Sequence, residues 1–282
     1  MNKILIINKE KDYTSRDVVN IVSKKLGTKK IGHFGTLDPL AEGVLVLGIG
    51  KYTKLLNLLP YDDKEYVAVV KVGVKTDTYD ITGNVIEEKT IEFLDEDVLK
   101  NALNHFKGTY MQEVPIYSAV KVNGKKLYQY ARNGESINLP KKEVTIKDIE
   151  LLSIVKEDTY YFTFKTTVSK GTYIRSLIND VSLYLGIPLT MSKLLRTRQD
   201  IFKIEDSYTL KDIEEGNYKL LDIEDILNVN VKETGDLYKK IINGNMLEYE
   251  NDDMVLYKHN NENVALYVYN KEKNKMLPFI IY

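Results

Sequence analysis

The chain has 282 residues, which is enough for one large domain or for one domain with a small appendage. Hydrophobic residues make up 43% and charged residues 29%, as is ordinary for a soluble globular protein. There is no cysteine, which excludes a disulfide scaffold, a thiol nucleophile and any metal site with cysteine ligands. Neither a signal-peptide core nor an apolar run long enough for a bilayer occurs, so we expect a cytoplasmic protein.

The net charge of −1 conceals basic segments that could form one face of the protein. Residues 115–134 carry four basic side chains and no acidic one, and residues 165–199 carry six against the single Asp180. Acidic residues concentrate in 205–253, with 14 Asp and Glu against 5 Lys. A basic face would suit a nucleic-acid partner, although each segment alone also fits an ordinary solvated surface.

Apolar periodicity and turn residues predict an α+β chain without regular alternation of strand and helix. Strands are expected at 3–8, 43–50, 64–73, 144–155 and 159–168. Helices are expected at 16–26 with Ser15 as the cap, from Asp95 to Phe106, and at 172–185, with a loop at 28–42 and a tight turn at Asn123-Gly124.

The acidic stretch 205–228 separates this body from the rest of the chain. Residues 229–282 show a short helical segment and three β-like runs, which predict a small β-rich appendage. We therefore expect a main body at 1–228 and a small appendage at 229–282.

The segment GHFGTLDPLAEG, residues 32–43, has the highest density of chemically informative residues. Asp38 precedes Pro39, which favours an extended conformation at Asp38 and removes the next amide donor. A carboxylate on such a constrained loop with apolar neighbours can be aimed at a substrate. The alternative is that Asp38 only turns the loop, as Asp-Pro often does.

This segment resembles the signature of the bacterial tRNA pseudouridine-55 synthase (TruB) family. Five further segments resemble the family in the same order along the chain. They are KEYVAVVKVGVKTDTYDITGNV, VPIYSAVKVNGKKLYQYAR, SKGTYIRSLINDVSLYLG, LLRTR and the tail KKIINGNMLEYEND. The resemblance implies a pseudouridine synthase fold, with a mixed and largely antiparallel sheet in a catalytic body at 1–228. It also implies a PUA-like C-terminal appendage at 229–282, which helps to bind the RNA substrate and carries no chemistry.

The resemblance also implies roles for individual residues. Asp38 is the catalytic carboxylate, Arg175 pairs with it, and Tyr66 stacks on the target base, with a hydroxyl that could assist proton removal at C5. Tyr173 and Leu195 wall the pocket; without the resemblance, both would be read as core residues.

Further residues are expected to hold the RNA. His33 is expected to contact the flipped nucleotide or its phosphate, although a lone histidine is more often structural. The residues expected to grip the RNA backbone are Lys121, Lys125, Lys126, Lys170, Lys193 and Arg196.

One departure from the family pattern lies near the N-terminus. The family reads Lys-Pro-x-Gly-x-Thr-Ser, whereas this chain has Glu10 and Asp12 where the Pro and the Gly would stand. The path of this loop, and any role of Lys9, are left open by the sequence.

The implied reaction breaks the N1–C1′ bond of uridine, turns the base and rejoins it through C5. Nothing is oxidised or transferred to another molecule, so we expect no cofactor and no metal. One carboxylate suffices, either as a nucleophile at C1′ or as a base at C2′, and the sequence does not choose between them. By resemblance the substrate is uridine 55 in the T-arm stem-loop of tRNA, reached after base flipping.

Two alternatives to a stand-alone enzyme remain from the sequence. One is an RNA-binding module that has lost catalysis, and the other is a guide-RNA-dependent pseudouridine synthase that works with protein partners. The intact set of Asp38, Tyr66 and Arg175 favours an enzyme. We expect a monomer that needs neither a guide RNA nor a protein partner.

Overall fold

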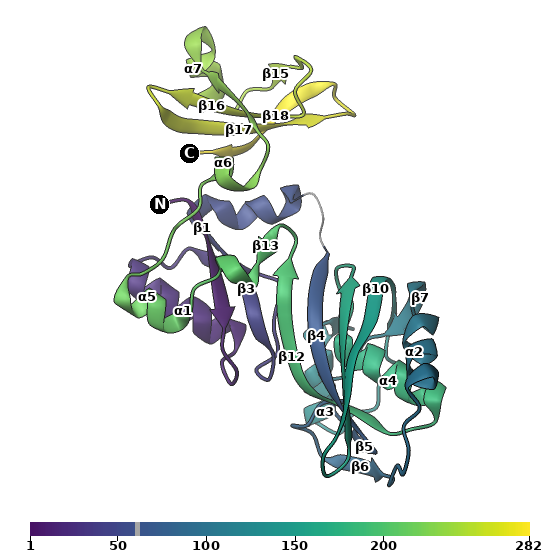
Figure 1. The fold of residues 1–282 in the computed structure, drawn as a ribbon. Helices are drawn as coiled ribbons and strands as arrows, with labels where there is room; N and C mark the ends of the chain where they lie inside the picture. Colours follow the sequence, from purple (N-terminus) through teal and green to yellow (C-terminus); the bar gives the residue numbers. More distant parts are fainter. Residues whose placement is uncertain (60–62) are drawn as a thin grey trace.

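The body of the protein is built on one nine-stranded sheet (Figure 1), seen here in a computed structural model that describes residues 1–59 and 63–282. The main path of the sheet runs β1-β3-β12-β4-β11-β10-β7, with β2 paired to β3 and β13 paired to β12. Its strands are β1 (Lys3–Lys9), β2 (Ile31–Phe34), β3 (Glu42–Ile49), β4 (Lys64–Val72), β7 (Gly108–Glu113), β10 (Lys141–Lys156), β11 (Tyr160–Val168), β12 (Leu189–Gln199) and β13 (Phe202–Lys203). The β3–β12 pair is parallel and the other described pairs of this sheet are antiparallel, which confirms a mixed and largely antiparallel sheet.

Strand alternation divides the buried side chains between two hydrophobic clusters. On β1, Leu5 and Ile7 enter the main core, whereas Ile4 and Ile6 enter a second cluster on the opposite face. This follows from the period of two in an extended strand. Helices α1 (Ser15–Leu26), α2 (Glu96–His105), α4 (Ile174–Leu185) and α5 (Leu210–Glu215) contribute buried residues to the main core.

Most of the predicted elements are confirmed, with two corrections. Helix α1 is capped by Thr14 in a capping box with Asp17, so Ser15 is not the cap. The predicted loop 28–42 contains strand β2. The acidic stretch 205–228 lies within the predicted body, where Leu221 bridges to Ile4 and exchanges backbone hydrogen bonds with β1.

Two excursions leave the main sheet. Strands β5 (Val74–Thr76) and β6 (Val85–Glu88) form one hairpin. Strands β8 (Lys121–Val122) and β9 (Lys125–Lys126) form the other, and helix α3 (Leu127–Arg132) follows it directly. Asn123 (φ 52°) and Gly124 (φ 81°) turn the second hairpin with positive φ, as a type I′ turn requires. The predicted turn is confirmed.

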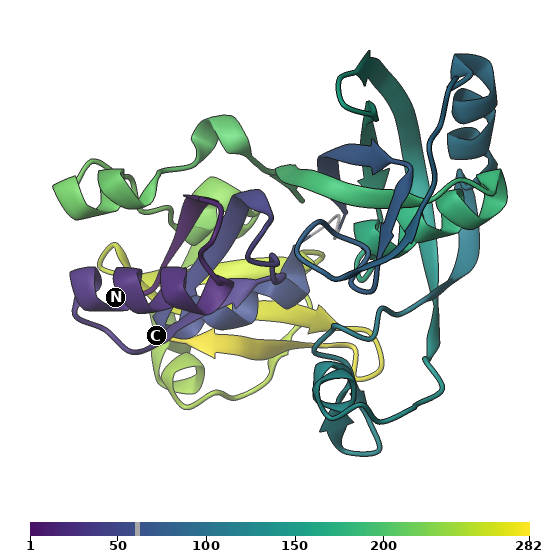
Figure 2. The same cartoon turned by 90° about the horizontal axis from the view of Figure 1, so that it is seen from below.

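The last part of the chain forms a separate five-stranded sheet in the order β14-β16-β17-β18-β15. Its elements are β14 (Asn230–Glu233), 3-10 helix η3 (Gly235–Leu237), α7 (Tyr238–Ile242), β15 (Leu247–Glu248), β16 (Met254–His259), β17 (Glu262–Asn270) and β18 (Lys275–Ile281). This β-rich arrangement agrees with the predicted PUA-like appendage. Both views place the sheet beside β1 and the 3-10 helix η1 (Gly50–Leu58) (Figure 1, Figure 2).

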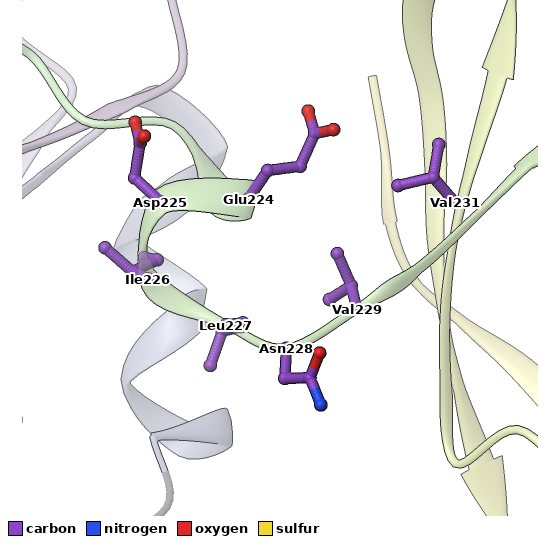
Figure 3. Close-up of a pocket in the computed structure, with 7 residues that line it drawn as sticks. All are labelled: Glu224, Asp225, Ile226, Leu227, Asn228, Val229 and Val231. Carbon is purple, nitrogen blue, oxygen red and sulfur yellow. The ribbon is translucent and has the colours of Figure 1, made fainter.

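The appendage and the body share a hydrophobic cluster. Leu256, Leu266 and Ile280 of the C-terminal sheet belong to the same cluster as Ile4 and Ile6 of β1. The chain crosses between the two sheets after helix α6 (Ile223–Ile226), around a hollow of about 430 Å³ that Figure 3 shows. Removing residues 229–282 would therefore expose apolar surface of the body. The boundary at 228/229 remains a prediction.

The hollow in Figure 3 belongs to this junction. Its lining residues are Glu224, Asp225, Ile226, Leu227, Asn228, Val229 and Val231. Glu224 accepts hydrogen bonds from Lys258 of β16, at 3.0 and 2.9 Å, and so ties α6 to the appendage. Within the described part of the chain, no helix has the length and apolar character needed to cross a membrane.

Candidate active site

A cavity of about 490 Å³ opens beside Asp38. Its walls come from the loop after β2, from β4, from β12, from the segment 117–128 and from the start of α4. The lining residues are Gly35, Thr36, Leu37, Asp38, Lys64, Tyr66, Tyr117, Ser118, Ala119, Tyr128, Lys170, Gly171, Thr172, Tyr173, Ile174, Arg175, Leu194, Arg196 and Gln199. Segments distant in the sequence thus meet around one carboxylate.

The loop that carries Asp38 is held by the N-terminal segment. The Ser15 hydroxyl accepts a hydrogen bond from Leu37 N (3.0 Å) and donates one to Leu37 O (3.1 Å). Asp12 N donates to Pro39 O at 2.8 Å, on the other side of Asp38. Ser15 therefore fixes the peptide groups next to the catalytic candidate, a role that the sequence analysis did not assign to it.

Lys9 provides a further anchor for this loop. Its side chain is fully buried, and Nζ donates to the carbonyls of Tyr13 (2.7 Å), Glu10 (2.9 Å) and Pro39 (3.4 Å). Burial lowers the pKa of Lys9 to about 8, against the opposing charges of Glu42 and Asp38. A pKa of about 8 leaves Lys9 mostly protonated at neutral pH, with its three N–H donors available to these carbonyls.

The departure from the family pattern has a visible structural consequence. Asp12, at the position of the family's Gly, adopts a φ of 70°, in the left-handed region that glycine occupies without strain. Asp is among the residues that tolerate this conformation best. The loop therefore keeps a glycine-like path without glycine, and Lys9 has a structural role in holding it.

Arg196 also holds the loop, from a buried position on the cavity wall. Its predicted role in gripping the RNA backbone stays a prediction. Its side chain is fully buried, with Nε donating to Val44 O (2.6 Å) and Nη2 donating to Gly35 O (3.1 Å). Gly43 lies against the Arg196 backbone, where an added Cβ would come within 2.2 Å of its carbonyl oxygen. Two of the three guanidinium nitrogens thus donate to backbone carbonyls around the loop that carries Asp38.

Asp38 and Arg175 form an ion pair at the cavity. The distance between Asp38 Oδ2 and Arg175 Nη2 is 2.9 Å, and the side chains are 41% and 7% exposed, respectively. Arg175 also donates to Thr78 O (3.2 Å, from Nη1) and to Tyr117 O (3.1 Å, from Nη2). The guanidinium is therefore fixed by the protein on several sides, while the carboxylate remains accessible to a substrate.

A second carboxylate, that of Asp80, lies near Arg175 but does not line the cavity. The sequence analysis did not identify it as part of the site. It is 5% exposed, and its Oδ2 lies 3.8 Å from Arg175 Nη1. Its Oδ1 accepts hydrogen bonds from Thr78 Oγ1 (3.0 Å) and Thr82 N (2.9 Å), which fix its orientation. The spacing of Thr78, Asp80 and Thr82 contained the signal, since Asp and Thr side chains form turns by accepting hydrogen bonds from backbone groups two residues on.

The two tyrosines of the predicted site are among the residues that line the cavity. Tyr66 lies on β4, is 6% exposed, and is the register neighbour of Arg196 on β12 and of Thr166 on β11. Tyr173 immediately precedes helix α4, two residues before Arg175. Burial raises the pKa of the Tyr173 hydroxyl above its ordinary value, so the phenol stays protonated at neutral pH.

Two other predicted pocket residues lie outside the cavity lining. Leu194 lines the cavity and the predicted Leu195 does not. Neighbouring residues of a strand point to opposite faces, so an offset of one residue exchanges the two sides.

His33 is also absent from the lining, and its Nδ1 is buried without a hydrogen-bond partner among the described residues. Burial lowers the pKa of His33, and the positive charges of Arg16 and Arg196 lower it further.

The remaining basic residues lie on exposed or half-buried positions. Lys121, Lys125 and Lys126 belong to the β8–β9 hairpin, Lys193 lies on β12, and Lys170 lines the cavity. Lys121, Lys170 and Lys193 are exposed, whereas Lys125 and Lys126 are half-buried. Tyr128 of α3 and Lys170 line the same cavity, so both predicted basic segments reach its rim.

The chemistry available at this cavity is that of one carboxylate. Among the described lining residues Asp38 is the single acid, and Glu42 does not line the cavity. This arrangement differs from the two flanking carboxylates of most glycosidases. The described residues contain no group of three or more His, Cys, Asp or Glu positioned to hold a metal ion. One carboxylate can act as a nucleophile or as a base.

Comparisons with known proteins agree on one family. A family model described as "TruB family pseudouridylate synthase (N terminal domain)" matches residues 23–174. The tRNA pseudouridine synthase B of Caldicellulosiruptor saccharolyticus is 41% identical over 247 residues, which are 88% of this chain and 84% of that protein. The protein of the same name from Staphylococcus aureus is 45% identical over 218 residues, 76% of this chain and 72% of that protein.

Solved structures show the same fold. A chain in the crystal structure of a Cbf5-Nop10-Gar1 complex is 24% identical, with a TM-score of 0.68 over 99% of this chain and 84% of that chain. A chain in the structure of an H/ACA RNP bound to a substrate RNA containing 2′-deoxyuridine is 23% identical, with a TM-score of 0.66 over 99% of this chain and 83% of that chain. At this identity the likeness confirms the predicted fold and carries no further conclusion.

Proposed function

Because this chain belongs to the TruB family of pseudouridylate synthases, and is therefore an isomerase that forms pseudouridine, we propose that it converts uridine 55 of tRNA, with Asp38 as the catalytic carboxylate. The observation that carries the proposal is the accessible Asp38 carboxylate, paired with the buried Arg175 at 2.9 Å on the wall of a nucleotide-sized cavity. The relatives named tRNA pseudouridine synthase B support tRNA as the substrate.

The proposed reaction requires the target uridine to leave its stack. Asp38 lies in a cavity of about 490 Å³, which a base within a helical stack would not enter. After flipping, Asp38 acts at C1′ or C2′, the N1–C1′ bond breaks, and the base turns. A C5–C1′ bond then forms, and the proton on C5 is lost as N1 gains one. Arg175 compensates and orients the carboxylate charge through these steps.

Tyr66 provides a test of how the base is handled. Its ring is proposed to stack on the uracil, and its hydroxyl to assist removal of the C5 proton. Tyr66→Phe keeps the ring, so we expect tRNA affinity within about threefold of the unaltered chain and a chemical step slower by about 10²- to 10⁴-fold. Single-turnover kinetics and filter binding measure the two quantities. An unaltered single-turnover rate would remove the hydroxyl from the reaction and leave only stacking.

The appendage is proposed to bind RNA without taking part in the chemistry. Lys239 and Lys240 are exposed on α7, within the tail segment that resembles the family. Reversing both charges with Lys239→Glu and Lys240→Glu is expected to weaken tRNA binding by about 10-fold or more and to reduce its salt dependence. Turnover at saturating tRNA should remain within about twofold, because these residues touch no reacting atom.

A matched control keeps the change of net charge constant. Lys271 and Lys273 are exposed in the turn between β17 and β18 of the same appendage, outside the family-like segment. The double variant Lys271→Glu, Lys273→Glu should bind tRNA more tightly than the α7 variant. Equal losses in the two variants would indicate a general electrostatic effect instead of a binding surface on α7. These substitutions are preferable to truncation, since deletion of the appendage would expose the shared hydrophobic cluster.

The proposed position is tested with a T-arm stem-loop. The purified chain should form pseudouridine in this hairpin at the position of uridine 55, and a hairpin with cytidine there should stay unmodified. Flipping can be followed with 2-aminopurine next to the target, whose fluorescence should rise when the hairpin binds. Modification at another uridine would refute the assignment of position 55 while leaving pseudouridine formation intact.

A further inference from the structure

A chain of partly buried hydrogen bonds lies outside the cavity and joins the edge strand β7 to the start of α4. Gln112 on β7 is 1% exposed. Its Oε1 accepts a hydrogen bond from Tyr173 N at 2.8 Å, and its Nε2 donates to Tyr173 O at 3.2 Å. The carboxamide therefore pairs with both the amide and the carbonyl of one residue, as a neighbouring strand would.

The orientation of this carboxamide is fixed by its other partner. Gln112 Nε2 also donates to the Tyr110 hydroxyl at 2.8 Å, and Tyr110 in turn donates to Asp180 Oδ2 at 3.0 Å. Burial raises the pKa of Asp180 to about 6, so Asp180 is mostly ionised at neutral pH and accepts this bond. Burial also raises the pKa of Tyr110, which keeps its proton for donation. Both protons of Gln112 Nε2 are thus used.

The residue held by Gln112 stands at the start of the helix that supplies the active site. Tyr173 is the N-cap of α4 without a side-chain cap hydrogen bond, and its side chain lines the cavity. Arg175, two residues later, makes the 2.9 Å pair with Asp38. A shift of the Tyr173 peptide would therefore move a cavity wall and the partner of Asp38 together.

We propose that Gln112 is a positioning residue, whose carboxamide pairs with the main chain of Tyr173 and so sets the first turn of α4 for catalysis. Tyr110 and Asp180 orient this carboxamide from behind. The proposal rests on the function proposed above, because Tyr173 and Arg175 matter here through their places beside Asp38. Gln112 itself does not line the cavity, so it would act through Tyr173.

The fold supplies a matched control for this role. Ser176 is 3% exposed, and its hydroxyl donates to Glu113 O at 2.8 Å, which also ties α4 to β7. Ser176→Ala removes a buried tether between the same two elements but leaves the main chain of Tyr173 paired. A residue that only fastens α4 to the sheet should behave like Ser176, whereas a positioning residue should not.

The test compares Gln112→Glu, Tyr110→Phe and Ser176→Ala with the unaltered chain. Gln112→Glu keeps the size of the side chain and one acceptor, but it cannot donate to Tyr173 O when ionised. We expect its single-turnover rate to fall by about 10- to 100-fold, since small misplacements of catalytic groups cost that much. Its tRNA affinity should stay within about threefold. Ser176→Ala should keep its single-turnover rate within about threefold of the unaltered chain, even where its melting temperature falls as much as that of Gln112→Glu.

Tyr110→Phe keeps the pairing with Tyr173 and removes the hydroxyl that accepts from Gln112 and donates to Asp180. Its single-turnover rate should lie between those of the other two variants. If Gln112→Glu does not fold, the comparison of Tyr110→Phe with Ser176→Ala tests the inference instead. A rate for Gln112→Glu within threefold of the unaltered chain overturns the inference. The inference is also overturned if Gln112→Glu and Ser176→Ala lose single-turnover rate to the same extent for the same fall in melting temperature. Failure of the unaltered chain to form pseudouridine would instead overturn the proposed function on which the inference rests.

Discussion

Asp38→Asn is expected to abolish pseudouridine formation while leaving the fold and tRNA binding intact. The amide is neither a useful nucleophile nor a base, so turnover should fall by about four orders of magnitude or more. The side chain is 41% exposed and the substitution is nearly isosteric, so little packing is lost. Single-turnover assays, filter binding and a thermal melt measure the three properties separately.

Glu42→Gln is the matched control for this prediction. Glu42 is a second carboxylate, four residues from Asp38, at the start of β3, and it does not line the cavity. Its neutralisation should leave turnover within about threefold, because it touches no reacting atom. Turnover by purified Asp38→Asn above the level of contaminating enzyme would remove Asp38 from the catalytic role.

Arg175→Lys is expected to reduce turnover by about 100-fold or more, with a much smaller effect on tRNA affinity. The guanidinium pairs with Asp38 and at the same time donates to the carbonyls of Thr78 and Tyr117. A lysine ammonium is a point charge on a flexible stem and cannot hold these directions together. The positive charge is retained, so a loss of turnover would report orientation.

Arg198→Lys controls for the general cost of replacing a partly buried arginine. Arg198 makes a two-point pair with Asp63, at 3.2 Å from Nη1 to Oδ1 and 3.2 Å from Nη2 to Oδ2, and does not line the cavity. Its substitution should lower stability without slowing turnover in proportion. An unchanged turnover number for Arg175→Lys would place the functional partner of Asp38 elsewhere.

The sequence predicted the strongly patterned elements and the order of the chemical segments. The strands around 43–50 and 64–73 and the turn at Asn123-Gly124 are confirmed, because alternation and positive-φ residues are local signals. Strand β2 was predicted as loop, since it has only four residues and two glycine neighbours within or beside it. Short strands are stabilised by their sheet partner rather than by their own composition.

Burial and side-chain direction were the parts that the sequence could not supply. Arg196 was predicted to contact RNA from its charge, yet its carbonyl partner Val44 lies 152 residues away in the chain and holds it in the interior. Leu195 and Leu194 are chemically equivalent, and only the pleat of β12 decides which of them faces the cavity. Asp80 reaches Arg175 through a turn whose path depends on tertiary packing.

The central claim is that this chain alone isomerises uridine 55 of tRNA. The most direct measurement is release of tritium from an unmodified tRNA transcript labelled at C5 of uridine, with purified protein and neither guide RNA nor partner protein. The predicted result is release that reaches about one equivalent per tRNA, from a transcript with uridine at position 55 and not from one with cytidine there. No release from bare tRNA, or release that appears only when a guide RNA is added, would contradict the claim.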